Sequence, residues 1–517
     1  MTKPVFNTFT TVVWDMLQTT GVGTRRLTGW GRFFWKRPDM QPFDTVIRNA
    51  RVVTAADTFT SDIGIRDGRI VALGLDLPPG HQEIDATGRH VTPGGIDSHV
   101  HLDQPTGDGS VMADDFFSGT VSAACGGTTT VIPFACQQKG ETLRSAVDDY
   151  HRRAGNKPVI DYAFHLIVTD PTPQVLREEL PALIAEGYTS FKIYMTYDAL
   201  KLGDREILET LSVARREGAM VMLHAENSDC IAWLTERLLA AGLTAPRYHS
   251  ASRPMLVERE ATHRAIALAE LVDVPILIVH VSGREAVEQI RWAQSQGLKV
   301  YAETCPQYLF LTADSLGCDD SFEGAKCICS PPPRDAANQK VIWDGLENGS
   351  FEIFSSDHAP FRFDGPDGKK AHGEEVSFDQ IANGIPGIET RMALLWSEGV
   401  RSGRITAQSF VALTSTNAAK MYGLYPRKGS IAIGADADMV IWNEGEAVHL
   451  CNEMLHHNVD YTPYAGMTLS AWPAMTLSRG EVVWDGEPRG EAGRGRFLPC
   501  ERPAPAQLLR RKTELDL

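Results

Sequence analysis

Residues 190–226 read SFKIYMTYDALKLGDREILETLSVARREGAMVMLHAE, and this stretch decides the fold. Two short apolar runs, SFKIYMTY and AMVMLHAE, flank the segment EILETLSVARREG, whose apolar residues recur with the period of a helix. Buried strands that alternate with helices predict a parallel sheet. The two strands also carry unusual polar groups, because Lys192 lies inside the first run and His224 near the end of the second.

The same alternation extends over residues 96–420. Helical patterns such as GREAVEQIRWAQSQG (283–297) separate several of the apolar runs. The further strand candidates are TTTVIPFA (128–135), VIDYAFHLIV (159–168), PILIVHVS (275–282), KVYAETCP (299–306) and FEIFSSDHAP (351–360). Seven or eight such strand–helix units predict a (β/α)₈ barrel of the TIM type.

Both ends of the chain read instead as short β-strands. DTVIRNARVVT and DIGIRDGRIVALG near the start alternate apolar and polar residues, and KGSIAIGADADMVIW and MTLSRGEVVWDG do so near the end. We therefore predict an α/β protein in which a small β-sandwich, built from residues 44–95 and 421–490, flanks the catalytic barrel at 96–420. Residues 1–43 form an N-terminal extension. Residues 491–517 form a C-terminal tail rich in Pro, Gly and Arg, expected on the surface or on a partner subunit.

Composition narrows the classes of function. The 517 residues carry a formal net charge of −16, which disfavours nucleic acid and anionic lipid as partners and favours a small molecule. The nine cysteines form no Cys-x-x-Cys pair, which favours a reducing compartment. No apolar run reaches the ~20 residues of a membrane span, and the start lacks the features of a secretory signal. The extension at 1–43 is basic and aromatic; an arm on a neighbouring subunit is favoured over a membrane-contacting segment.

Six polar residues lie in or near the ends of five separate strand candidates, and the strand ends are where a barrel collects its catalytic groups. Each has an ordinary alternative: a lone histidine is usually structural, a lysine usually exposes its charge, and an aspartate can cap a helix. Taken together, the six residues follow the order His-x-His, Lys, His, His, Asp along the chain, and such a combination is not expected by chance. The six are His99 and His101 in GGIDSHVHLD, Lys192, His224, His280 in LIVHVSG, and Asp357 in EIFSSDHAP.

This set of residue types points to metal chemistry. His99 and His101 are two apart on a strand, so both imidazoles can face one ion. Four imidazoles and one carboxylate are too few to hold two divalent ions. A lysine that has added carbon dioxide becomes a carbamate, which can bridge two ions about 3.5–4 Å apart. An apolar strand around Lys192 would supply the neutral amine that this addition needs, because burial lowers the pKa of lysine.

The sequence resembles the amidohydrolase superfamily, and within it the dihydropyrimidinase and D-hydantoinase family, from about residue 44 to 490. The stretches that carry the likeness are TPGGIDSHVHLD, ADDFFSGTVSAACGGTTTVI, SFKIYMTY, AETCPQYL, SPPPR, SSDHAPF, NGIPGIETR, GLYPRKGSIAIGADADMVIW and VDYTPYAGM. The resemblance implies hydrolysis of a cyclic amide in dihydropyrimidines or 5-substituted hydantoins, giving N-carbamoyl amino acids. It also implies a cytoplasmic homotetramer with two divalent ions per subunit, for which zinc suits the ligands best.

The resemblance assigns a role to each site residue. His99, His101, Lys192 and Asp357 would hold the first metal, and Lys192 as its carbamate, with His224 and His280, the second. A hydroxide between the metals would attack the ring carbonyl, and Asp357 would carry its proton to the departing nitrogen. Tyr197 would donate a hydrogen bond to the developing oxyanion. Ser330 and Asn383 would bind the substrate's amide edge through backbone groups.

Several departures from the family pattern leave the substrate open. Ala382 stands where the family usually has Pro, and Tyr194 and Lys201 stand where bulky apolar residues are common. The loop from Asp357 to Asn383 is a few residues longer than usual, and the loop after His101, DQPTGDGSV, is more polar. Allantoinase and imidase therefore remain alternatives. Asp103, where dihydroorotases carry arginine, disfavours a dihydroorotase.

A non-catalytic scaffold like the collapsin response mediator proteins is the alternative from another class. Those proteins have lost metal ligands, whereas this chain keeps all six, so the enzyme is favoured. His165 and His358 lie near the same strands, but their positions favour structural roles, because His165 is mid-strand and His358 follows Asp357 directly.

Overall fold

The stretch at 190–226 forms one strand–helix–strand unit of the computed structural model, which describes residues 42–107 and 109–508. Strand β10 (Ser190–Tyr194) leads to helix α4 (Asp204–Glu217) and strand β11 (Met220–His224). The backbone N–H of Gly203 donates to the Glu206 carboxylate over 2.7 Å, which caps the helix start. Gly218, with a φ of 76°, ends the helix in the left-handed conformation.

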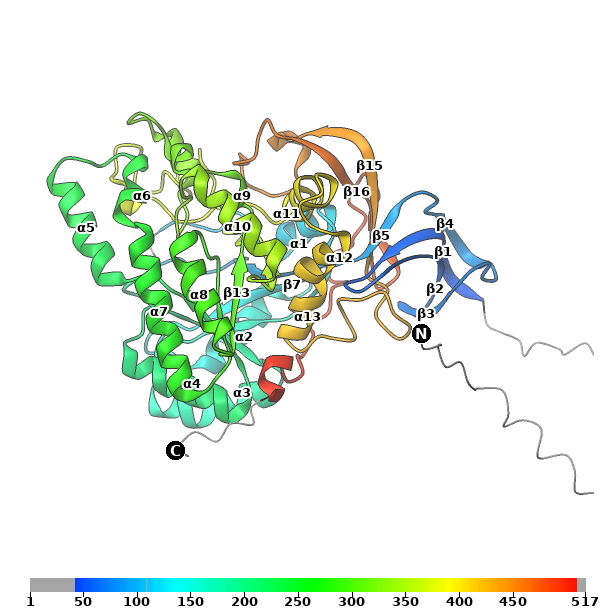
Figure 1. The fold of residues 1–517 in the computed structure, drawn as a ribbon, viewed down its shortest axis with the longest axis horizontal. Coiled ribbons are helices and arrows are strands. Elements are labelled where there is room, and N and C mark those ends of the chain that lie inside the picture. Colours follow the sequence, from blue (N-terminus) through cyan, green and yellow to red (C-terminus); the bar gives the residue numbers. More distant parts are fainter. Residues whose placement is uncertain (1–41, 108, 509–517) are drawn as a thin grey trace, which may run out of the picture. The chain divides into compact units, whose positions relative to one another are not determined.

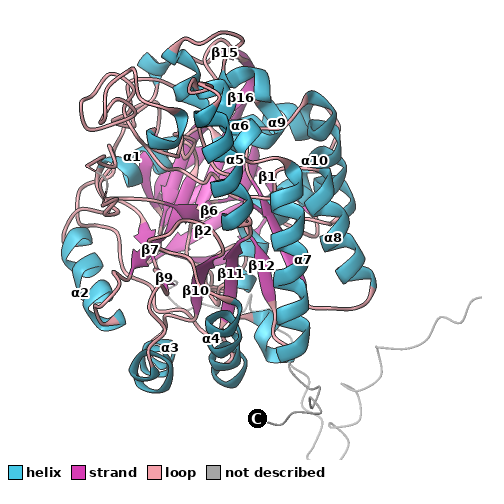
Figure 2. Cartoon of the chain, turned by 90° about the vertical axis from the view of Figure 1, so that its left-hand side faces the viewer, coloured by secondary structure: helices cyan, strands magenta, loops and turns pink. Residues whose placement is uncertain are grey.

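Eight parallel strand positions close into the barrel, with helices around the outside (Figure 2). The ladder runs β14-β13-β12-β11-β10-β9-β7-β6, and β8 pairs with β7. The ring closes where the backbone N–H of His101 donates to the carbonyl of His358 over 2.7 Å. The remaining barrel strands are β6 (Gly95–Val100), β7 (Thr128–Cys136), β8 (Asp161–Tyr162), β9 (His165–Ile167), β12 (Ile276–Ile278), β13 (Val300–Thr304) and β14 (Ile353–Phe354).

Helices follow the strands along the chain and cover the outside of the barrel (Figure 1). The other helices are α1 (Ser118–Cys125), α2 (Leu143–Ala154), α3 (Leu180–Ala185), α5 (Ser228–Ala240), α6 (His249–Ser252), α7 (Met255–Val272), α8 (Arg284–Ser295), α9 (Gln307–Phe310), α10 (Ala336–Asn348), α11 (Arg391–Leu395), α12 (Ala407–Val411) and α13 (Asn417–Met421). The predicted TIM-type barrel is therefore confirmed.

Two predicted strands are shorter than the apolar runs suggested. The run VIDYAFHLIV is divided between β8 and β9, and only two residues of FEIFSSDHAP belong to β14. Strand β14 already ends at Phe354, and three residues later Asp357 has a φ of 50°, outside the extended region, so the run does not continue as one strand to its end. Apolar runs locate such strands but do not show where the backbone turns.

Both ends of the chain share a second sheet, as predicted. Its order is β17-β16-β15-β5-β1-β2-β3, with β4 beside β1. Strands β5 and β15 join the two halves in antiparallel pairing, with Met439 opposite Pro93. The strands are β1 (Phe43–Val53), β2 (Thr58–Arg66), β3 (Arg69–Gly74), β4 (Gly80–Asp85), β5 (His90–Pro93), β15 (Met439–His449), β16 (Thr468–Ser478) and β17 (Glu481–Trp484). They appear beside the barrel in Figure 1.

The described part of the C-terminal tail packs on its own barrel. The backbone N–H groups of Leu498 and Cys500 donate to the carbonyls of Tyr162 and Gly187 over 2.7 and 2.9 Å. Phe497 lies against the rings of an aromatic cluster beside them. The predicted subunit arm at 1–43 lies almost wholly outside the described residues. Among the helices at 42–508, none is both long and apolar enough to cross a membrane.

Candidate active site

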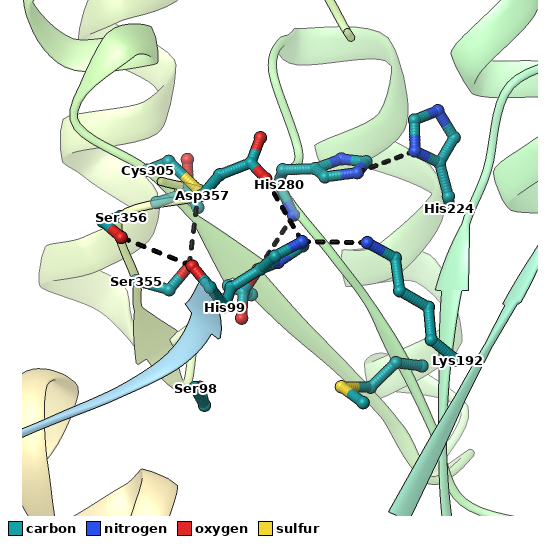
Figure 3. A network of polar contacts seen from close by, with 12 residues as sticks. Ser98, His99, Lys192, His224, His280, Cys305, Ser355, Ser356 and Asp357 are labelled. Atoms are coloured by element: carbon teal, nitrogen blue, oxygen red, sulfur yellow. Dashed lines mark hydrogen bonds and ion pairs between the residues drawn. The ribbon is translucent and has the colours of Figure 1, made fainter. Parts of the chain in front are cut away.

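The six side chains singled out in the sequence converge at the C-terminal end of the barrel strands. We call them the ligand cluster: His99, His101, Lys192, His224, His280 and Asp357. They come from β6, β10 and β11 and from the segments that follow β6, β12 and β14. All six are buried, and Asp357 is the most exposed at 9%. Figure 3 shows His99 between Asp357 and Lys192, with His280 beside His224.

Within the cluster, one group of atoms gathers around Asp357. Its Oδ1 lies 3.2 Å from Nε2 of His99 and 3.5 Å from Nε2 of His101. The ligand atoms of these three residues all lie within 4.8 Å of one another. The Nζ of Lys192 is 2.8 Å from the same His99 nitrogen. Two imidazole nitrogens and a carboxylate oxygen that face one point are a suitable set for a divalent metal.

A second pair of ligand atoms lies across the cluster. Nε2 of His280 is 2.9 Å from Nδ1 of His224. Burial lowers the pKa of both imidazoles, so both are neutral near pH 7. Two neutral imidazoles that direct ring nitrogens at each other provide nitrogen lone pairs for a cation between them.

The outer ring nitrogens support this interpretation. Nδ1 of His99 is 2.6 Å from Glu303, Nδ1 of His101 is 2.7 Å from Gln104, and Nε2 of His224 is 2.7 Å from Glu226. When each of these nitrogens carries the proton, the opposite nitrogen presents a lone pair to the cluster. The described residues therefore fit divalent metal ions, in agreement with the predicted cofactor class.

Among residues 42–107 and 109–508, no carboxylate is in ion-pair contact with Lys192, whose nearest polar partner is His99. Its Nζ lies 4.6 Å above the ring of Phe134 and 4.7 Å above the ring of Tyr194. Burial lowers the pKa of Lys192 to about 8, against the opposing attraction of Asp357. A substantial fraction of this amine is therefore neutral near pH 7.5.

The backbone is strained at three of the predicted site residues. Tyr197, His280 and Asp357 have φ values of 67°, 39° and 50°, in the left-handed region that non-glycine residues rarely adopt. Such outliers cost of order 1–3 kcal/mol each and concentrate at functional sites. Here they turn the chain directly after, or close to, a barrel strand, and all three residues line the same cavity.

That cavity has a volume of about 520 Å³ and lies over the ligand cluster. Tyr197, Ser330 and Asn383 line its side, and the Ser330 hydroxyl donates to Oδ1 of Asn383 over 2.9 Å. Burial raises the pKa of Tyr197 to about 12, so its hydroxyl stays protonated and can donate. A Cβ at Gly384 would lie 2.4 Å from the Cβ of Ala359, which requires glycine beside Asn383.

The two histidines that the sequence analysis did not count as metal ligands, and two of the residues that depart from the family pattern, contact other side chains. His165 contacts the Ser190 hydroxyl at 2.6 Å, and His358 contacts Asp114 at 3.1 Å. Asp103 accepts from Arg153 over 2.9 Å, and Lys201 donates to Ser228 over 3.1 Å. Of the unusual substitutions, Tyr194 lines the cavity, whereas Lys201 does not.

Sequence reasoning missed the residues that contact the ligands from outside. Glu303 stands as a lone acid inside the apolar run KVYAETCP, which was a usable signal for a buried partner. Glu226 follows His224 by two residues, the spacing that places both on one side of an extended chain. Arg253, which donates to Glu226 over 2.8 Å and lies 5.5 Å from the Tyr197 ring, gave no local signal.

A second group of possible ligands, Cys125, Glu389 and His456, does not fit a metal as well. Both Glu389 oxygens already accept hydrogen bonds, from Ser122 and from His456. Burial raises the pKa of the Cys125 thiol far above its usual range, so no thiolate is available. These contacts explain the group as a structural one.

Comparison with known proteins gives consistent matches. The sequence profile of the amidohydrolase family matches residues 90–483. The D-hydantoinase of Geobacillus stearothermophilus is 46% identical over 88% of this chain and 96% of its own length. The crystal structure of dihydropyrimidinase from Brevibacillus agri superposes with a TM-score of 0.86 at 45% identity, covering 89% of this chain and 99% of that one. The structure of D-hydantoinase from Bacillus sp. AR9 superposes with a TM-score of 0.85 at 47% sequence identity, covering 88% of this chain and 99% of that one.

Proposed function

Since the chain belongs to the amidohydrolase family, and within it to the hydantoinases and dihydropyrimidinases, we propose that it hydrolyses a cyclic amide. The substrates are dihydropyrimidines such as dihydrouracil and dihydrothymine, or 5-substituted hydantoins, and the products are N-carbamoyl amino acids. The observation that carries the proposal is the convergence of the ligand cluster at one cavity of about 520 Å³: five of its members line the cavity, and His99 contacts two of those five, Asp357 and Lys192. A cavity of this size accommodates a small heterocycle.

The proposed cofactors are two divalent ions, with zinc the metal that best suits imidazole and carboxylate-type ligands. Lys192, carboxylated on Nζ, would contribute to both sites. His99, His101 and Asp357 would complete the first, and His224 and His280 the second. When bound, such a pair lowers the pKa of water and polarises a carbonyl. The neutral fraction of the Lys192 amine supports carboxylation, because only a neutral amine adds carbon dioxide.

The chain's own residues would move the proton and bind the ring. Burial alone would raise the pKa of Asp357, but its contacts with His99 and His101, at 3.2 and 3.5 Å, hold that pKa far below its usual range. Asp357 is therefore ionised, ready to accept a proton from the attacking water and deliver it to the ring nitrogen. The protonated hydroxyl of Tyr197 would donate to the developing oxyanion. Ser330 and Asn383 would hold the amide edge.

Polar groups on the cavity rim keep a second substrate class open. Gln104, Thr106 and Gln138 line the cavity together with apolar residues such as Met112 and Leu200. These amide and hydroxyl groups could hydrogen-bond a polar ring substituent, which favours allantoinase or imidase activity as the alternative within the same chemistry. A non-catalytic scaffold is disfavoured, because it would have no use for a complete ligand cluster.

Location and assembly complete the proposal. A cytoplasmic location is supported by the cysteines, since all nine lie in the described chain as free thiols. A homotetramer is proposed from the sequence resemblance alone, and size measurement in solution tests it.

The test is a ring-opening assay. Purified protein with divalent metal and bicarbonate is incubated with dihydrouracil, a 5-substituted hydantoin, allantoin and a simple cyclic imide, while the ring absorbance in the far ultraviolet is followed. We expect opening of dihydrouracil or the hydantoin and about two metal ions per subunit. Opening of allantoin or the imide alone would establish the alternative, and opening of none would overturn the proposal.

A further inference from the structure

A buried lysine outside the ligand cluster makes unusual contacts. Lys369 is 1% exposed, and its Nζ donates to three backbone carbonyls: Ile328 over 3.0 Å, Ala382 over 2.6 Å and Gly384 over 2.6 Å. An ammonium group has three donors, so its hydrogen-bonding capacity is filled by main chain. Within the described ranges, 42–107 and 109–508, no carboxylate lies within ion-pair distance of it.

These carbonyls belong to the two segments that carry Ser330 and Asn383. We call residues 328–330 and 382–384 the amide-edge wall, because both segments line the cavity. Lys369 contacts a carbonyl two residues before Ser330 and the two carbonyls on either side of Asn383. The segments otherwise meet through the Gly384 N–H to the Ile328 carbonyl, at 3.0 Å, and through the Ser330 hydroxyl.

The chain reaches this position through a tight turn. The backbone N–H of Lys369 donates to the carbonyl of Arg362 over 2.7 Å. A Cβ at Gly368 would lie 2.0 Å from the same carbonyl, so only glycine permits the turn. Residues near Lys369 also hold the rim of the cavity, because the carbonyls of Pro360 and Asp367 accept from the N–H groups of Ala113 and Val111, each over 2.7 Å.

An uncompensated buried ammonium is a costly way to stabilise a fold. Burial lowers the pKa of Lys369 to about 7, because no counter-ion offsets the desolvation of the cation. The three carbonyls act in the opposite direction, since only the ammonium form can donate to all of them. A well-packed apolar side chain of similar volume would often stabilise such a position as well or better. What the lysine provides is geometry, because one nitrogen fixes three carbonyls at hydrogen-bond distance from a single point.

We propose that Lys369 is a positioning residue that sets the spacing of the two segments of the amide-edge wall. This inference rests on the proposed function, in which Ser330 and Asn383 hold the substrate's amide edge. Lys369 does not line the cavity, so it would act through the backbone and not by contact with substrate.

The experiment compares Lys369→Met with Lys370→Met as the matched control. Lys370 is the next residue in the chain and pairs at the surface with Asp364 and Glu374. We expect Lys369→Met to raise KM for the ring substrate about tenfold, with kcat changed less than about threefold, because lost ground-state positioning acts on binding. Metal content should stay at the wild-type value, and Lys370→Met should match wild type in KM.

A purely structural role gives a different result. It would lower the amount of active protein and therefore the maximal rate, while KM stayed unchanged. That outcome in folded Lys369→Met would overturn the proposal. If Lys369→Met does not fold, Lys369→Gln replaces it; its amide still donates two hydrogen bonds, so we expect a smaller rise in KM, and an unchanged KM again overturns the proposal.

A substrate analogue tests whether Lys369 acts through the wall. Asn383→Ala would leave the wall's backbone groups in place, so the change is made in the substrate: with a ring substrate methylated on its imide nitrogen, which has lost that hydrogen-bond donor, the rise in KM caused by Lys369→Met should shrink to less than about threefold. Full additivity would contradict the mechanism. Failure of the proposed function is separate, since it would show as wild-type protein that opens no ring. Failure of the positioning proposal shows only against an active wild type.

Discussion

The floor and the side of the cavity are built in different ways. On the floor, the ligand cluster consists of side chains at strand ends, and three of its four imidazoles contact an outer side chain, such as Glu303 or Glu226. On the side, the amide-edge wall consists of loop backbone tied together by Lys369. The floor is fixed by side-chain chemistry, and the wall is fixed by main-chain geometry.

This contrast has a consequence for mutation. Ligands that share ions depend on one another, so the loss of one should disable the whole floor. In the proposed function the wall would bind a substrate through several separate hydrogen bonds, so single changes there should weaken binding by degrees. The following experiments separate these two behaviours.

The largest effect should come from Lys192→Ala. The variant loses the proposed bridge between the two metals, so we expect most bound metal to be lost and turnover to fall about a thousandfold or more. Metal analysis and the ring-opening assay measure both effects. Added short-chain carboxylates should restore part of the activity by standing in for the carbamate. Full metal content with normal turnover would show that Lys192 does not help to bind the metals.

Tyr197→Phe should have the next largest effect. The substitution removes the hydroxyl that would donate to the oxyanion but leaves the ligand cluster intact, so the metals should stay bound. We expect kcat to fall about a hundredfold, typical of one oxyanion donor. Steady-state kinetics with metal analysis on the same sample provides the measurement. Normal turnover would show that the strained backbone at Tyr197 serves another purpose.

Glu303→Gln probes the outer support of the floor. Burial raises the pKa of Glu303 to about 8, so the carboxylate is favoured only when a cation is bound nearby. Gln keeps the shape of the side chain but cannot become a carboxylate beside Nδ1 of His99, so metal affinity should fall about 10–100-fold. Competition with a chelator measures that affinity. Glu352→Gln is the control, because Glu352, just before β14, accepts from the Ala302 backbone N–H over 2.9 Å and not from a ligand imidazole. Equal affinities in both variants would contradict the role of Glu303.

The same contrast explains what the sequence could predict. The barrel, the sheet shared by both chain ends and the candidate ligands followed from apolar periodicity and from residue type at strand ends. Ser330 and Asn383 were found only through resemblance to a family, because isolated loop residues carry no chemical signal. The role of Lys369 also had no signal in the sequence, because its three partners are backbone carbonyls, which every residue possesses.

Backbone turns also escaped prediction. Strand β14 ends at Phe354, and Asp357 shortly after it has a φ of 50°; no local pattern marks an aspartate for the left-handed region. Such conformations are imposed by the surrounding packing, and single-sequence periodicity does not contain that information. The position of the C-terminal tail could not be predicted from its composition either. Its hydrogen bonds with Tyr162 and Gly187 join residues that are far apart in the chain.

The smallest effect concerns pH and sharpens the account of Lys192. Burial lowers the pKa of its amine to about 8, so the neutral fraction rises about tenfold per pH unit below that value and levels off above it. Only the neutral amine adds carbon dioxide. Metal-free protein, mixed with metal at constant dissolved carbon dioxide, should therefore regain activity about tenfold faster at about pH 7 than at about pH 6. The gain should become small above about pH 8.5. A reactivation rate independent of pH would mean that carboxylation of Lys192 does not limit assembly of the floor.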